Sequence, residues 1–282
     1  MQINTDWHIH SRNSCDEAAL PVATLLDDAA NAGILDFGLT DHLHTQFNLP
    51  DLYASRREFD AVIHSPHVHF GAEVSCVSQW ELDEIATGRY ADPVYGLRGG
   101  GKPGAALAIG LTEENIAALG IEYVVGGTHW PMYVPLERET VIRDYHRQNM
   151  YLAAHPLVTI VAHPWWWMGH WQDADGVYRT APWFDDFGHI PQSMHEEFAA
   201  AAREHGKVVE INLGATFLNP SYPETFKRQY VEYLARLQQA GVTLSIGSDC
   251  HDARYHPDFT TAARILTAAG IDGSRLWRLA GS

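Results

Sequence analysis

Histidines and carboxylates stand close together near the start of the chain. Residues 6–16 read DWHIHSRNSCD, with an aspartate at each end of the segment. His8 and His10 are two residues apart, so on a β-strand both imidazoles point to the same face. Imidazole and carboxylate groups in such an arrangement can bind a divalent cation. It then matters whether other parts of the chain supply more groups of this kind.

The same residue types recur at the ends of predicted strands. Seven apolar segments alternate with helix-like segments and are predicted to be strands: 3–10, 36–42, 68–75, 123–130, 158–164, 208–213 and 243–249. Histidines or carboxylates arrive at the carboxyl end of nearly every one: His8, His10, Asp41, His42, Glu73, His129, His163, Asp249 and His251.

Strands that alternate with helices form parallel sheets. The predicted helices are 20–34, 112–119, 138–154, 193–205 and 224–240. In the fourth helix, Ser193 and Glu196 have the spacing of a capping box. Because an α/β barrel brings the carboxyl ends of its strands to one mouth, we expect a closed or nearly closed barrel. A doubly wound open sheet is the alternative, but it would not easily bring seven strand ends to one point.

Two long segments interrupt this alternation, at 76–111 and 165–192. Both follow the carboxyl ends of strands, where lids and substrate pockets are found. The glycine cluster GLRGGGKPG in the first segment lacks the P-loop pattern, so we interpret it as a loop. We expect a single barrel domain over residues 1–282, with these two segments as insertions.

The crowding of these side chains indicates bound cations. Several carboxylates and imidazoles gathered together would be costly without positive ions to neutralise them. Imidazole and carboxylate ligands together suit zinc, manganese and iron. We therefore predict a site for two or three divalent metal ions, whose identity these ligands do not decide.

Composition limits the partners. The formal net charge is −16 at pH 7, which argues against nucleic acid as the main partner. No apolar run approaches the length of a membrane span and no signal peptide is visible, so we expect no membrane partner and a cytoplasmic protein. The three cysteines are widely spaced, which argues against a disulfide framework. A monomer and a homo-oligomer are both compatible with the sequence.

Six short motifs carry a resemblance to a known family. They are DWHIHSRNSCD, LTDH, GAEVS, GGTHW, VAHP and IGSDCH, in this order between residue 6 and about residue 252. Together they resemble the PHP (polymerase and histidinol phosphatase) superfamily of metal-dependent hydrolases. The resemblance implies a distorted (β/α)7 barrel with a trinuclear metal site at the C-terminal ends of its strands, and usually phosphoester hydrolysis.

The resemblance also implies which residues are ligands. It assigns them to three metals: His8, His10 and Asp249 to the first, His129 and His163 to the second, and His42 and His251 to the third. Glu73 matches the glutamate that bridges two metals. Asp16 stands where the family often has a histidine; a carboxylate can also be a ligand, but the occupancy of the third position stays open.

The chemistry of hydrolysis follows from such a centre. Adjacent divalent cations lower the pKa of a shared water, so that hydroxide is available at neutral pH. Asp249 could take the proton of that water. Asp6 and Asp41 neighbour ligand histidines in the sequence and are candidates to orient them. Glu210 and Asn212 could line the pocket or only support the barrel.

Substrate-binding residues are harder to predict. Phosphate is commonly held by arginine or lysine, and these total only 19. Arg12 and Arg254 follow ligand motifs and are candidates, and Arg98 could fold in from the first long segment. Six tryptophans could wall a pocket for an aromatic group or pack the second long segment: Trp130, Trp165, Trp166, Trp167, Trp171 and Trp183. We expect one or two of them, with Trp130 a candidate, to face a small anionic or aromatic substrate.

Three functions remain open at this point. The first is a phosphomonoesterase similar to histidinol phosphatase. The second is a hydrolase of the same type that acts on a cyclic phosphodiester, an ester or an amide. The third is a non-catalytic module that binds a partner or stores metal, which the nearly complete ligand set disfavours. Removal of metal should abolish hydrolysis in the first two cases and leave partner binding intact in the third.

Overall fold

The main sheet consists of parallel strands, as the sequence predicts. The computed structural model describes residues 1–16, 18–62, 65–167 and 182–279. The strands, in spatial order, are β1 (Thr5–Ile9), β2 (Asp36–Leu39), β4 (Val68–Ser75), β7 (Tyr123–Gly127), β8 (Ile160–Ala162), β9 (Val208–Asn212) and β10 (Thr243–Gly247). Each neighbouring pair is parallel, and the short β3 (His42–Leu43) pairs with β4. All seven predicted strands are present.

The first and last strands meet at their carboxyl ends. The backbone N–H of Asp249 donates to the carbonyl of His8 at 2.8 Å, and that of His10 donates to the carbonyl of Cys250 at 3.3 Å. Ile9 and Cys250 form a parallel bridge at the same place. The sheet is therefore nearly closed into a barrel, which confirms the predicted (β/α)7 architecture and excludes the open sheet.

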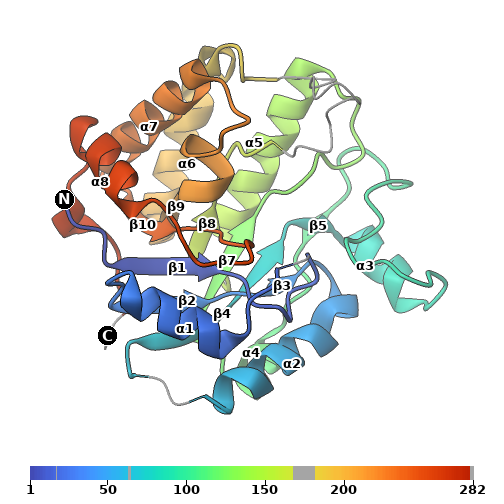
Figure 1. Ribbon diagram of the computed structural model, residues 1–282. Helices are drawn as coiled ribbons and strands as arrows, with labels where there is room; N and C mark the ends of the chain where they lie inside the picture. Colours follow the sequence, from blue (N-terminus) through green and yellow to red (C-terminus); the bar gives the residue numbers. More distant parts are fainter. Residues whose placement is uncertain (17, 63–64, 168–181, 280–282) are drawn as a thin grey trace.

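Helices cover the outside of this barrel. In Figure 1, one group lies along one side of the sheet and comprises α1 (Val22–Asn31), α2 (Leu49–Asp60) and α4 (Glu113–Leu119). The other group comprises α5 (Arg138–Ala154), α6 (Gln192–Glu204), α7 (Glu224–Gln239) and α8 (Phe259–Ala268). The five predicted helices are present, and the sequence patterns missed α2, α8 and the short α3 (Gln79–Ala86).

The capping box predicted for the fourth helix was wrong. Helix α6 begins at Gln192 and Pro191 occupies its N-cap position, so Ser193 already lies in the first turn. The fixed φ of proline, here −59° to −55° at the N-caps of α1 and α6, suits the entry into a helix without a side-chain cap.

Shorter elements fill the connections. The first long segment, 76–111, contains an antiparallel pair and a helix: β5 (Val77–Ser78), α3 (Gln79–Ala86) and β6 (Leu107–Ala108). Single turns of 3-10 helix are η1 (Gln46–Asn48), η3 (Phe187–His189) and η5 (Gly273–Arg275), and a π-helical turn is η4 (Leu213–Phe217). Within the described residues, no helix is both long enough and apolar enough to cross a membrane.

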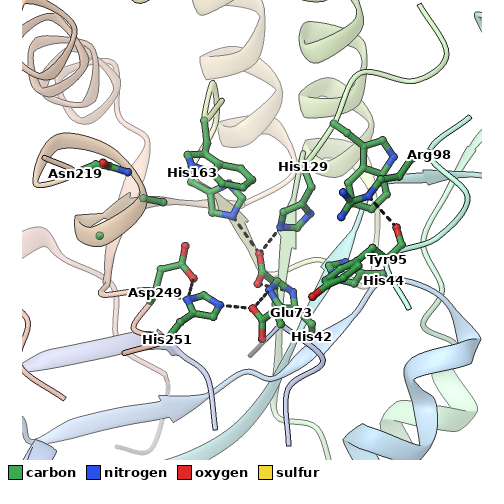
Figure 2. Close-up of a pocket in the computed structure, with 15 residues that line it drawn as sticks. His42, His44, Glu73, Tyr95, Arg98, His129, His163, Asn219, Asp249 and His251 are labelled. Atoms are coloured by element: carbon green, nitrogen blue, oxygen red, sulfur yellow. Dashed lines mark hydrogen bonds and ion pairs between the residues drawn. The ribbon is translucent and has the colours of Figure 1, made fainter. Parts of the chain in front are cut away.

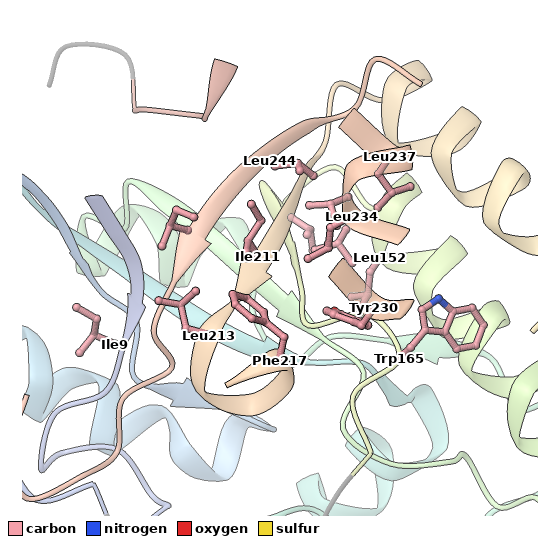
Figure 3. Close-up of a cluster of buried hydrophobic side chains, with 14 of the residues drawn as sticks. Ile9, Leu152, Trp165, Ile211, Leu213, Phe217, Tyr230, Leu234, Leu237 and Leu244 are labelled. Atoms are coloured by element: carbon pink, nitrogen blue, oxygen red, sulfur yellow. The ribbon is translucent and has the colours of Figure 1, made fainter. Parts of the chain in front are cut away.

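The main core lies between the sheet and the helices. Figure 3 shows Ile211 of β9 and Leu244 of β10 near Leu234 and Leu237 of α7, and all four side chains are buried. These α7 positions are three apart and recur on one face of the helix, as an amphipathic helix on a barrel requires. This apolar layer packs against the outer face of β9 and β10 and so holds the strands whose carboxyl ends reach the predicted site.

The opposite end of the barrel is filled by aromatic rings. Tyr123 donates its hydroxyl hydrogen to the carbonyl of Trp7 at 2.8 Å, and the two rings pack edge to face 5.7 Å apart. Gly38 and Gly71 make room for Tyr123, because a Cβ on Gly38 would lie 1.6 Å from the Tyr123 hydroxyl oxygen. The barrel is therefore packed at this end and opens only at the mouth formed by the carboxyl ends.

We predict that Gly38→Ala destabilises the barrel without touching the site. The added methyl group must displace the buried Tyr123 ring, and overpacking of this kind costs about 1–3 kcal/mol of unfolding free energy. Denaturant unfolding measures this loss. Gly99→Ala is the control, since a Cβ there meets only one atom, at 3.9 Å. Equal stability of the two variants would contradict this account of the packing.

Candidate metal centre

The carboxylate of Glu73 stands at the centre of the site, on β4, and is fully buried (Figure 2). Its Oε1 lies 3.1 Å from Nε2 of His129 and 3.1 Å from Nε2 of His163. Its Oε2 lies 2.9 Å from Nε2 of His8 and 2.9 Å from Nδ1 of His42. One carboxylate thus faces imidazoles from four other strands, which is possible because all these strands end at the same mouth.

The predicted ligands form three overlapping groups. In each group, one nitrogen or oxygen atom per residue lies within 4.8 Å of the others. The groups are His8, His10, Glu73 and Asp249; His42, Glu73 and His129; and His10, Asp16, His42 and His251. The structure therefore brings all nine predicted ligands together, with His163 joining through Glu73. Their assignment as ligands stays a prediction.

The arrangement fits metal ions better than it fits hydrogen bonds. Nε2 of His8, Nε2 of His10 and Oε2 of Glu73 are buried and have no hydrogen-bond partner among the described residues. Yet each nitrogen lies within 3.4 Å of that oxygen. These atoms also belong to a group whose nitrogen and oxygen atoms all lie within 4.8 Å of one another. A cation between these atoms would satisfy all three, as their chemistry as donors of lone pairs allows.

The electrostatics of the protein alone show the same need. Burial tends to raise the pKa of Glu73, but the charges of His42, His8 and His129 outweigh it and hold that pKa well below its usual range. Burial tends to lower the pKa of His8, but Glu210, Glu73 and Asp249 raise it well above its usual range. In the protein alone, positive charge on His8 and His42, whose pKa values the carboxylates raise, accompanies the buried carboxylates, and a divalent cation can take its place.

Two residues of β9 hold the ligands in place. Oε1 of Glu210 lies 2.6 Å from Nδ1 of His8, and Oε2 accepts the backbone N–H of His163 at 2.9 Å. The amide of Asn212 donates to Oδ2 of Asp249 at 3.0 Å. Glu210 and Asn212 therefore orient ligand residues and do not line the cavity. A carboxylate that contacts the outer nitrogen of a ligand histidine fixes its ring and tautomer.

Asp6 and Asp41 have a different role from the predicted one. Asp6 accepts the backbone N–H of Ser248 and the hydroxyl of Tyr255, both at 2.8 Å. Asp41 accepts the backbone N–H of Ser11 at 2.5 Å and its hydroxyl at 2.6 Å. Both carboxylates thus hold the backbone of ligand-bearing loops, and the expectation that they orient imidazole rings was wrong. Adjacency in sequence places them near a histidine backbone, whereas Glu210 reaches the ring from another strand.

A cavity of about 350 Å³ opens beside the ligands. Beyond the predicted ligands, its walls include His44, Tyr95, Arg98, Trp130, Trp166 and Asn219. The guanidinium carbon of Arg98 lies 4.9 Å from the ring centre of Tyr95 and 4.8 Å from that of Trp130. Arg98 is the only arginine or lysine among the described residues that line this cavity. The cavity wall therefore combines one guanidinium group, an aromatic surface and the cluster of predicted ligands.

Arg12 and Arg254 do not reach the cavity, so their predicted role in substrate binding finds no support. The Arg12 side chain is 55% exposed and its Nε lies 3.2 Å from Oε2 of Glu58 on α2. Arg254 is exposed on the loop after β10. Trp130, the third predicted substrate-binding residue, does line the cavity.

The tryptophans divide into two sets. Trp166 lines the cavity, with its ring centre 5.8 Å from that of His129 and 5.3 Å from that of His163. Trp165, Trp167 and Trp183 are buried in the core and pack against one another. Trp171 lies outside the described residues. Three of the five described candidate tryptophans therefore pack the second long segment onto the barrel, and Trp130 and Trp166 line the cavity.

His44 is the cavity histidine that the sequence patterns missed, and Tyr95 and Asn219 are further wall residues that were not predicted. His44 is buried, its ring stacks on that of His42 with centres 4.6 Å apart, and its Nδ1 lies 2.6 Å from the hydroxyl of Ser75. Burial, with the charges of His42 and His129, holds its pKa well below the usual range. The signal was present, because His42 and His44 repeat the H-x-H spacing of His8 and His10.

We predict that His8→Ala/His10→Ala removes about one metal ion per chain. Both imidazoles belong to the same group around Glu73 and Asp249, so no other pair in that group can compensate. Elemental analysis of protein purified in the presence of zinc or manganese measures the stoichiometry. His205→Ala, an exposed histidine at the end of α6, is the control and should keep the full content. Unchanged stoichiometry in the double variant would sink the assignment.

Comparison with known proteins supports the fold. No protein-family model and no curated protein matches the sequence. A crystal structure of a candidate histidinol phosphatase from Listeria monocytogenes matches with a TM-score of 0.57 and 10% identity over 88% of this chain and 95% of that one. An amidohydrolase from Chromobacterium violaceum matches with a TM-score of 0.36 and 16% identity over 95% of this chain and 97% of that one. The first of these structures shares the fold of this chain, as the barrel predicted from the sequence requires.

Proposed function

We propose that the protein is a metal-dependent phosphoesterase that hydrolyses a small phosphomonoester. The observation that carries the proposal is the gathering of eight histidines and aspartates around the buried Glu73, at the mouth of a barrel and beside a cavity. The fold similarity to a candidate histidinol phosphatase agrees with a hydrolase of this type. The small cavity and the acidic chain are consistent with a small substrate and with no nucleic acid as partner.

The ligand groups would hold two or three divalent ions of zinc, manganese or iron. His8, His10, Glu73 and Asp249 make one group, and Glu73 is shared with the group that includes His129. When bound, such ions supply Lewis acidity, a more acidic water and positive charge for the phosphoryl oxygens. The group with Asp16 has a carboxylate where the family often has a histidine, so metal analysis decides between two ions and three.

Asp249 is the proposed proton acceptor. It lines the cavity, and its side chain is 11% exposed, whereas Glu73 is fully buried. Asn212 holds its Oδ2, while its Oδ1 lies 3.5 Å from Nε2 of His8 and 3.2 Å from Nε2 of His10. A carboxylate fixed at the cavity wall in this way can accept the proton of an attacking water.

Arg98 is the proposed anion-binding residue on the opposite wall. In Figure 2 it lies across the cavity from Asp249. Tyr95 and Trp130 pack against the guanidinium, and its Nε donates to the backbone carbonyl of Tyr95 at 3.3 Å. Its two terminal nitrogens would bind the oxygens of a phosphate or a carboxylate. Trp166 supplies apolar surface for the alcohol part of the substrate.

A second candidate is the hydrolysis of a cyclic phosphodiester, an ester or an amide. The observation that favours it is the wall composition, because Arg98 is the sole arginine or lysine at the described part of the cavity while three aromatic rings line it. A substrate with one negative charge or none would need no further cation. The same ligand cluster would serve these reactions, so only substrate tests separate the two candidates.

Phosphate release tests the proposal. We expect purified protein loaded with manganese, zinc or iron to release phosphate from small monoesters, including histidinol phosphate, and chelation to abolish the release. Asp249→Asn should lower kcat by about 100-fold or more, because removing a general base costs 10²–10⁴-fold. Asp252→Asn, an exposed neighbour with the same chemical change, should keep the activity. A fully loaded protein that releases no phosphate from any monoester would favour the second candidate.

We predict that Arg98→Gln weakens substrate binding more than turnover. The loss of a hydrogen bond to a charged oxygen corresponds to a rise in KM of about 10- to 100-fold. Steady-state kinetics on the best monoester of the panel measures it. Arg254→Gln removes an exposed arginine that does not line the cavity and should leave KM unchanged. If both substitutions raised KM equally, substrate binding would depend on the net charge of the protein and not on a contact with Arg98.

A further inference from the structure

Ser75, the last residue of β4, lies between two imidazoles. Its hydroxyl oxygen is 2.8 Å from Nδ1 of His129 and 2.6 Å from Nδ1 of His44, and the serine is fully buried. A hydroxyl group has one hydrogen. Ser75 can therefore donate to only one of the two rings. If it accepted from both, its own buried hydrogen would lack an acceptor among the partners that the structure shows, so it donates to one ring and accepts from the other. The proton position on one histidine thus decides the proton position on the other.

The group that Nε2 of His129 faces decides which nitrogen of this ring carries the hydrogen. Its Nε2 lies 3.1 Å from Oε1 of Glu73, at the place where the site above would hold a metal. When Nε2 gives its lone pair to a metal, the neutral ring keeps its hydrogen on Nδ1. His129 then donates to Ser75, Ser75 donates to Nδ1 of His44, and His44 must carry its own hydrogen on Nε2.

Without a metal, the same chain runs in the opposite direction. The carboxylate of Glu73 can only accept, so Nε2 of His129 carries the hydrogen and its Nδ1 becomes an acceptor in the neutral ring. Ser75 then donates to His129 and accepts from Nδ1 of His44. Nε2 of His44 is left as a lone pair, which would repel the oxygen of an anionic ligand.

The ring of His44 is fixed in place at the cavity wall. Its centre lies 4.6 Å from that of His42, 5.7 Å from that of Tyr95 and 5.8 Å from that of Trp130. Its Nε2 is buried and has no hydrogen-bond partner among the described residues, although the residue lines the cavity. A buried polar atom without a partner calls for an explanation, and a bound ligand is one.

We infer that Ser75 couples metal binding at His129 to the tautomer of His44, so that only the metal-loaded protein offers an Nε2–H donor to an oxygen atom of the ligand. The inference rests on the metal-holding role proposed for His129, but it does not depend on which bond the protein hydrolyses. It makes His44 a ligand-binding residue and Ser75 a residue that positions its hydrogen.

Nitrogen NMR of histidine side chains tests the coupling directly. Protein labelled with ¹⁵N-histidine is compared after chelation and after loading with zinc, with His44→Gln and His129→Gln used to assign the signals. We expect His44 to be protonated on Nδ1 without metal and on Nε2 with zinc. Ser75→Ala should abolish this change, whereas Ser245→Ala, a buried serine outside the chain of hydrogen bonds, should preserve it.

The outcomes distinguish a failure of the coupling between His129 and His44 from a failure of the metal-holding role of His129. If zinc shifts the signals of His129 while His44 keeps one tautomer in both forms, the coupling is wrong and the metal site stands. If zinc leaves His129 unchanged, the metal-holding role fails and the coupling fails with it. Phosphate release from monoesters is a separate measurement, and its absence would not alter either result.

The donor role has its own test, in which inorganic phosphate is titrated into zinc-loaded protein. His44→Leu should weaken phosphate binding by about tenfold, because a donor to a charged oxygen is lost. His44→Gln keeps an amide N–H near the position of Nε2 and should recover part of the affinity. Metal content, measured in each variant, must stay equal to that of the unmodified protein. Equal phosphate affinity in His44→Leu would overturn the role.

Discussion

The structure depends on one buried carboxylate that faces several imidazoles. Glu73 is fully buried, and its two oxygens lie 2.9–3.4 Å from nitrogens of five histidines. Such a group is costly in a protein interior unless positive charge neutralises it. Many of the surrounding contacts hold the imidazoles near this carboxylate. Glu210 and Asn212 hold the ligand side chains, and Asp6 and Asp41 hold the loops that carry them.

The backbone is strained where this cluster is assembled. His163 and Asp249 have φ values of 27° and 55°; His163 directly follows β8, and Asp249 comes two residues after the end of β10. Positive φ is uncommon for residues other than glycine and persists only where the surroundings impose it. Here the Asp249 N–H closes the barrel and the His163 N–H is bound by Glu210. The same hydrogen bonds therefore stabilise the fold and turn two ligand side chains toward Glu73.

Much of this could be predicted from the sequence, because strand patterns and their polar ends are local. The seven strands follow from apolar segments, and the convergence of the ligands follows from the geometry of a parallel barrel. Helix α2 was missed because its buried face includes Ser55 among charged residues, which weakens the periodicity. The partners of Asp6 and Asp41 could not be predicted, since Ser248 and Tyr255 lie at the other end of the chain from Asp6.

Local sequence patterns also could not predict which residues line the cavity. Arg98 reaches the cavity because the buried Glu81 accepts the backbone N–H of Leu97 at 2.6 Å, while Tyr133 donates to the other oxygen of Glu81 at 2.8 Å. Arg12 turns away because Glu58 on α2 attracts it. Both outcomes depend on tertiary contacts between segments far apart in sequence. The H-x-H spacing of His42 and His44 was a local signal, but only the fold shows that His44 lines the cavity.

The seam between β1 and β10 has a consequence for how the protein matures. His8 and Asp249 lie on opposite sides of this seam, and the side chains of the same two residues belong to one candidate metal group. A cation held there would link the first strand of the barrel, β1, to the last strand, β10. Because the unfolded chain lacks such a preformed site, ion binding would strengthen the closed barrel and hold the seam shut. During synthesis this link could form only after β10 had emerged, so a loaded site would mark a barrel whose strands are all present.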